Sequence, residues 1–124
     1  MSIAEIAVVA LGIIHLGAFY KEVFDAKGLA GRVAGIDIKE VDNASPASVG
    51  KILALVQNQG VYNAFIGVGL LLTLTQVGDA ARAPQLYLSA CVVVAGLFGG
   101  RTVSPILYLQ AAIGAVVLAI VWFA

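Results

Sequence analysis

Few side chains in this sequence could do chemistry, because 61% of its 124 residues are hydrophobic and only 11% are charged. His15 is the only histidine, and Glu22 follows it by seven residues. On a helix this spacing is two turns and places both side chains on nearly the same face. An imidazole titrates near neutral pH and suits general acid–base catalysis. His15 and Glu22 are therefore the candidate catalytic pair, with Glu22 orienting the imidazole or receiving its proton.

A second set of polar side chains lies within apolar stretches. It consists of Asn58, Gln59, Tyr62, Asn63 and Gln110. Polar groups are costly in hydrocarbon when unpaired, so they usually face a bundle interior or a water-filled cavity. These residues, with His15 and Glu22, form the predicted ligand pocket. The alternative is that they serve only as hydrogen-bonding contacts between helices.

Several common chemistries do not fit these residues. One histidine and one cysteine cannot form the usual zinc sites, and His15 and Glu22 would lie about 10 Å apart along a helix, too far to share a metal ion. Phosphate-binding loops, nucleophile elbows and dinucleotide fingerprints are missing, so no metal and no cofactor is expected. Seven basic and seven acidic residues give zero net charge, which argues against nucleic acid as a partner.

Membrane helices must position these side chains, because a mean hydropathy of +1.02 leaves too little polar surface for a soluble domain. A helical span needs about 20 apolar residues. Four stretches qualify and predict one all-α domain, a polytopic bundle of four transmembrane helices over about 3–22, 46–77, 83–99 and 104–124. Residues of about 23–45 are expected to form a surface loop with room for one short helix. Both termini would then lie on the same side of the membrane.

The basic residues predict the orientation of this bundle. One side carries only Arg82, whereas the other carries Lys21, Lys27, Arg32, Lys39, Lys51 and Arg101. Cytoplasmic loops are enriched in lysine and arginine, so the long first loop is expected in the cytoplasm and both termini outside. Counting depth from the interfaces places His15, Asn63 and Gln110 in the same half of the bilayer. The predicted pocket therefore opens toward the cytoplasm.

Several short blocks of the sequence match a known family. They are Glu22–Phe24 after His15, Gly31–Val33, Asn58–Phe65, Val94–Gly99 and Gln110. On these residues the chain resembles the domain of unknown function 1304 family of small bacterial integral membrane proteins. The resemblance covers nearly the whole chain, although Val23 and Ala111–Ala112 depart from the usual residues. It implies a four-helix protein of the bacterial plasma membrane and supplies no established activity.

Three functions are compatible with these observations. The first is binding or transport of a small polar or amphiphilic molecule in the pocket. The second is an accessory or structural subunit of a membrane complex, and the third is a membrane enzyme acting on a lipid or isoprenoid with His15 as acid or base. The lipid bilayer is an expected partner. Gly96-x-x-x-Gly100 permits close helix approach, for which packing within the chain is preferred over a homodimer.

Overall fold

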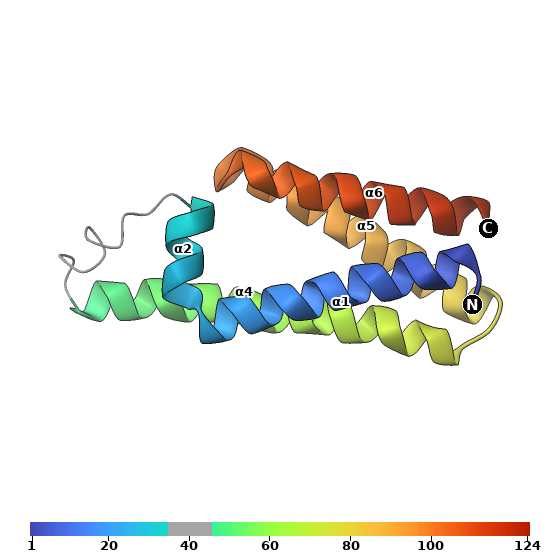
Figure 1. Ribbon diagram of the computed structural model, residues 1–124, viewed down its shortest axis with the longest axis horizontal. Helices are drawn as coiled ribbons and strands as arrows, with labels where there is room; N and C mark the ends of the chain where they lie inside the picture. The colour runs from blue at the N-terminus through green and yellow to red at the C-terminus, as the bar shows by residue number, and fades with distance from the viewer. Residues whose placement is uncertain (35–45) are drawn as a thin grey trace.

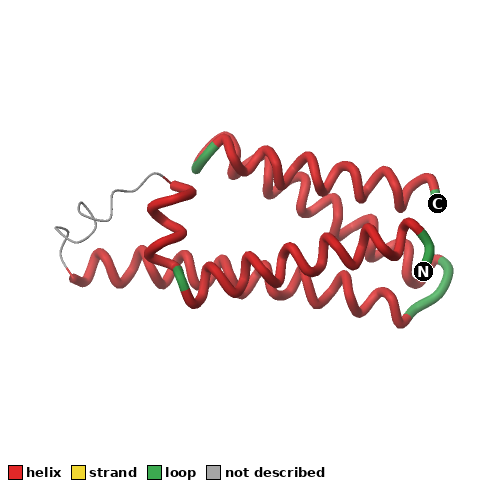
Figure 2. The backbone as a smooth tube through the Cα atoms, viewed as in Figure 1, coloured by secondary structure: helices red, strands yellow, loops and turns green. Residues whose placement is uncertain are grey.

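The computed structural model describes residues 1–34 and 46–124, and all regular structure in these residues is helical (Figures 1 and 2). The elements are α1 (Ile3–Phe24), α2 (Ala26–Ala34), α4 (Pro46–Leu72), η1 (Thr73–Thr75), α5 (Asp79–Thr102), η2 (Pro105–Leu107) and α6 (Tyr108–Phe123). The predicted all-α class is confirmed. Much of the predicted loop, including Lys39, lies outside the described residues.

Local side-chain chemistry explains how α1 begins and ends. The Ser2 hydroxyl accepts a hydrogen bond from the Glu5 amide at 3.2 Å, and the Ser2 amide donates to the Glu5 carboxylate at 2.7 Å. This reciprocal capping satisfies amide groups that the first turn leaves unpaired. At the other end, Asp25 caps α1 and accepts a hydrogen bond from Arg32, which lowers the pKa of Asp25. The short helix α2 therefore turns across the end of the bundle (Figure 1).

The turn between α4 and α5 sets where α5 begins. Gly78 has a φ of 58°, a backbone conformation that favours glycine. Asp79 follows it in the first turn of α5, where a negative charge offsets the positive end of the helix dipole. As a result α5 starts at Asp79, ahead of the expected start near residue 83. The 3-10 turn η1 likewise ends α4 at Leu72, before the expected end near residue 77.

Glycines bring the four long helices together as two close pairs. In the pair of α1 and α4, a Cβ added at Gly67 would lie 2.9 Å from the carbonyl oxygen of Gly12. In the pair of α5 and α6, a Cβ added at Gly96 would overlap the backbone of Ala111. A Cβ added at Gly100 would likewise overlap the ring of Tyr108. The close packing within the chain predicted for Gly96 and Gly100 is therefore confirmed, and their face of α5 is covered by α6.

The two helix pairs meet near the chain termini. The fully packed core consists of Val8, Leu11, Leu70, Val92, Val117 and Val121. Both termini lie at the same end of the bundle, and the pairs diverge from there toward α2 (Figure 1). One polar contact joins the pairs here, because Gln85 of α5 donates to the Thr73 hydroxyl of η1 at 3.0 Å. Within the second pair, Arg82 of α5 donates to the carbonyl oxygen of Trp122 of α6. The two helix pairs are therefore joined at the end of the molecule that holds the termini.

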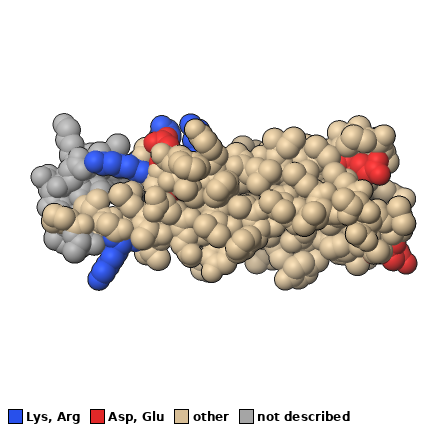
Figure 3. Space-filling view, turned by 90° about the horizontal axis from the view of Figure 1, so that it is seen from below, with Lys and Arg blue, Asp and Glu red and all other residues tan. Residues whose placement is uncertain are grey.

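Much of the outer surface is apolar. Within the described residues, three helices are long and apolar enough to cross a membrane: Ile3–Phe24, Asp79–Thr102 and Pro105–Phe123. The helix α4 is not among them, because Gln57, Asn58 and Gln59 interrupt its apolar sequence. Figure 3 shows lysine and arginine side chains gathered at the α2 end of the visible face, with an uncharged surface along its middle. A fourth span along α4 stays a prediction.

Candidate functional site

A cavity of about 490 Å³ lies between the two helix pairs, at the end where they diverge. All five described α-helices contribute to its walls. Its polar lining consists of Glu22 of α1, Gln59 and Asn63 of α4, Thr102 of α5 and Gln110 of α6. Its apolar lining includes Leu29 of α2, Leu55, Val56, Ala95, Phe98, Val103 and Leu107. The cavity is thus mostly apolar, with amides, a hydroxyl and a carboxylate at a few positions, as in many small-molecule sites.

A hydrogen bond between α1 and α4 holds the carboxylate at the cavity wall. Asn63 Nδ2 donates to Glu22 Oε2 at 2.6 Å. Gly60 allows this approach, because a Cβ at that position would lie only 2.9 Å from Cβ of Glu22. Gln57 Nε2 adds a second tie between the helices by donating to the Val23 carbonyl oxygen at 3.2 Å. These two contacts between α1 and α4 hold Glu22 in a defined position at the cavity wall.

The structure brings four of the seven predicted pocket residues to this cavity and leaves three elsewhere. Glu22, Gln59, Asn63 and Gln110 line it. Asn58 and Tyr62 are exposed on another side of α4. Helical spacing explains the division, since residues four apart share a face: Gln59 lies with Asn63, whereas Asn58 lies with Tyr62.

His15 is the third predicted residue outside the cavity lining. Its side chain is only 3% exposed, and Nδ1 donates to the carbonyl oxygen of Leu11 in its own helix at 3.0 Å. It shares the interior face of α1 with Val8, Leu11 and Gly12, where the helices pack closely. The hydrogen bonds seen in the described residues thus join His15 to Leu11 and Glu22 to Asn63, without linking the candidate catalytic pair.

Some lining residues were not predicted from the sequence. Leu55 precedes Gln59 by one turn and extends the stripe that ends at Asn63. Phe98 and Thr102 form a similar pair on α5. The spacing of four residues is visible in the sequence. Applied to α4, it would have predicted that Leu55 lies on the same helix face as Gln59 and Asn63. Nothing comparable marks Leu29, which reaches the cavity because α2 crosses the bundle end.

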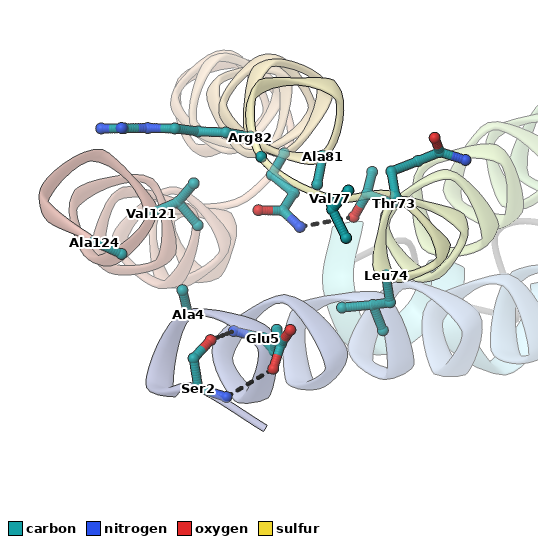
Figure 4. Close-up of a pocket in the computed structure, with 13 residues that line it drawn as sticks. Ser2, Ala4, Glu5, Thr73, Leu74, Val77, Ala81, Arg82, Val121 and Ala124 are labelled. Atoms are coloured by element: carbon teal, nitrogen blue, oxygen red, sulfur yellow. Dashed lines mark hydrogen bonds between the residues drawn. The ribbon is translucent and has the colours of Figure 1, made fainter.

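Two further hollows contain none of the predicted pocket residues. One, of about 330 Å³, lies near the termini and includes Glu5, Thr73 and Gln85; Figure 4 shows the Ser2–Glu5 capping bonds at its edge. The other is an apolar groove between α1 and α6, lined by residues such as Ile14 and Val116. In the described part of the chain, no group of three or more histidine, cysteine, aspartate or glutamate residues could hold a metal ion.

These observations define a small all-helical protein with membrane-type helices and a carboxylate-bearing cavity between two helix pairs. A family model described as "Protein of unknown function (DUF1304)" matches residues 7–122, so the chain belongs to this family, as its sequence resemblance indicated. All of the cavity residues fall within the matched range. No curated protein and no solved structure matches the chain.

Proposed function

We propose that this protein is a four-helix integral membrane protein that binds a small amphiphilic molecule in the cavity between its helix pairs. The observation that carries the proposal is the meeting of Glu22, Asn63 and Gln110 at one mostly apolar cavity. These residues come from three helices and are distant in the sequence. Polar groups placed together in this way suit a ligand with one polar end and one apolar end.

The fourth span is α4, and the cavity accounts for two of its polar residues. Gln59 and Asn63 line the cavity, while Phe65, Val68 and Leu72 are exposed apolar residues farther along the helix. Intramembrane polar side chains usually face the bundle interior in this way. The basic α2 end then faces the cytoplasm and both termini face outward, following the enrichment of lysine and arginine on cytoplasmic segments.

The cavity also has an apolar opening that a bilayer would cover. Leu55 of α4 and Phe98 of α5 line it, and each is 70% exposed. A ligand could therefore enter sideways from lipid, with its polar end toward Glu22 and its apolar end between α4 and α5. The cavity volume of about 490 Å³ lies within the range of small-molecule sites.

Binding is favoured over conduction through the molecule. The core residues Val8, Leu11, Leu70 and Val92 are at most 2% exposed. On their helices they come between the cavity-lining residues and the helix ends near the termini. A path across the bundle would have to separate this packed layer, which costs apolar contact energy. A ligand site that opens at one end requires no such separation.

Photo-crosslinking in lipid nanodiscs tests the proposal. Medium-chain alkyl probes that carry a diazirine would be irradiated with the full chain, and labelled peptides would be mapped by mass spectrometry. We expect labelling at Leu55 and Phe98 to exceed labelling at Leu109, which is 62% exposed on α6 and lines neither this cavity nor the two further hollows. Uniform labelling of all exposed apolar residues would contradict a binding site.

A matched pair of tryptophan variants provides the control. Ala95→Trp places a large side chain in the cavity, whereas Val94→Trp places it on an adjacent exposed position of α5 that does not line the cavity. We expect Ala95→Trp to reduce cavity labelling about tenfold, a change that corresponds to roughly 1.4 kcal/mol of binding free energy. Val94→Trp should leave it nearly unchanged. Equal effects of the two variants would count against the cavity as the site.

A further inference from the structure

We infer that the molecule bound in this cavity is a cationic amphiphile, with an ammonium group at Glu22 and an alkyl portion between α4 and α5. This inference rests on the proposed binding function and adds the charge class of the ligand. It follows from the charges on the cavity wall, from the hydrogen bonding of Glu22 and from the position of the apolar opening.

The described part of the cavity wall carries one formal charge. Glu22 is its only acidic residue, and no lysine, arginine or histidine is among the described residues that line it. The remaining polar groups are the neutral side chains of Gln59, Asn63, Thr102 and Gln110. A positive ligand is attracted to such a wall, whereas an anionic ligand is repelled by it.

The Glu22 carboxylate has capacity for a further partner. Asn63 donates one hydrogen bond, to Oε2, whereas an ionised carboxylate can accept about four. A carboxylate in apolar surroundings is costly unless it is paired and hydrogen-bonded. Arg32, a guanidinium on α2, is already engaged with Asp25. An ammonium ion in the cavity would supply the positive charge that the described lining residues lack.

The apolar part of the lining fits the rest of such a ligand. Phe98 and Leu55 stand at the opening between α4 and α5, and both are largely exposed. The face of an aromatic ring attracts cations within about 6 Å, so Phe98 could assist entry of the ammonium group. An alkyl chain attached to that group would then contact Leu55 and surrounding lipid. Charge and shape therefore favour a lipophilic amine over a fatty alcohol or a fatty acid.

The test compares three diazirine probes with the same alkyl chain and different head groups: a primary amine, an alcohol and a carboxylate. The full chain would be labelled in nanodiscs of zwitterionic phosphatidylcholine. Labelling at Leu55 and Phe98 would be divided by labelling at Leu109, which corrects for unequal partition into lipid. We expect the amine to exceed the carboxylate about tenfold, equivalent to roughly 1.4 kcal/mol, with the alcohol between them.

Two isosteric variants on α1 test whether the preference for the amine probe depends on the Glu22 carboxylate. Glu22→Gln should reduce labelling by the amine about tenfold and change labelling by the alcohol little. Glu5→Gln makes the same substitution at the other end of the helix, away from this cavity, and should leave all three probes unaffected. If Glu22→Gln fails to fold, the order of the three probes on the unaltered protein still decides the question.

The outcomes separate the two proposals. Equal labelling by all three head groups, or a preference for the carboxylate, overturns the inferred positive charge while binding in the cavity stands. Amine labelling that survives Glu22→Gln unchanged overturns the role of Glu22. If no probe labels Leu55 and Phe98 above Leu109, the proposed binding function itself fails.

Discussion

At the scale of single residues, the interior contains one hydroxyl group that is hydrogen-bonded and one that has no partner among the described residues. Thr73 is buried, accepts a hydrogen bond from Gln85 at 3.0 Å and donates one to the carbonyl oxygen of Leu70 at 2.6 Å. The Ser89 hydroxyl is fully buried and has no hydrogen-bond partner among the described residues. A buried donor without a partner costs about 1–3 kcal/mol, whereas a paired one contributes modestly to stability.

Substitutions at these two hydroxyls should therefore change stability in opposite directions. Ser89→Ala removes an unpaired polar atom and should raise the free energy of unfolding by up to about 1 kcal/mol, or leave it unchanged. Thr73→Val keeps the side-chain shape but deprives Gln85 of its acceptor, and should lower the free energy of unfolding by about 1–2 kcal/mol. Thermal unfolding in detergent, followed by circular dichroism, measures both. A large loss of stability in Ser89→Ala would show that its hydroxyl is bonded.

At the scale of helices, close backbone approach determines how α5 packs on α6. A Cβ at Gly96 would overlap the backbone nitrogen and Cα of Ala111, which no side-chain rotation can relieve. Gly17 on α1 is the opposite case, because a Cβ there would meet nothing within 4 Å. The two positions offer a matched comparison of the same substitution in two helices.

Gly96→Ala should separate α5 from α6 and lower the free energy of unfolding by about 2–3 kcal/mol. Gly17→Ala should be neutral or should stabilise the protein by about 0.5–1 kcal/mol, because alanine favours a helix over glycine. Unfolding midpoints of the purified variants in the same detergent provide the comparison. Similar midpoints for the two variants would show that the α5–α6 contact is less close than described.

At the scale of the whole molecule, the proposed topology determines on which side of the membrane the cavity opens. The proposed topology places Gly50, at the start of α4, in the cytoplasm and Val77, after its end, outside. Both positions are exposed, and a Cβ at Gly50 would meet nothing within 4 Å. Labelling at these two positions therefore shows whether α4 crosses the membrane. Polar residues lower the hydropathy of this helix.

Single-cysteine labelling tests this topology in a background in which Cys91 is replaced by serine. In intact cells, a membrane-impermeant maleimide should label Val77→Cys, and it should label Gly50→Cys only after lysis. The reverse result would invert the orientation while preserving four spans. Equal labelling of the two positions in intact cells would show that α4 does not cross the membrane.

The sequence by itself determined the all-helical class, the apolar character of three long helices and the family of the chain. These properties follow from composition and local order, because hydropathy adds along a segment regardless of what surrounds it. The start of α1 is equally local, since Ser2 and Glu5 cap it without help from another helix. The intramembrane position of the polar residues of α4 stays a prediction, because α4 is not among the three described helices that are apolar enough to span.

Only the tertiary structure decided which of these polar groups share a cavity. It placed Asn63 against Glu22 and Gln110 beside the same cavity, whereas His15 was enclosed in the packed interior. The reason is that a helix such as α1 is apolar on nearly all sides, so its sequence does not show which side meets a partner. Rotation and spacing are set by contacts between helices, such as Gly12 with Gly67 and Gly96 with Ala111, which involve residues far apart in the chain.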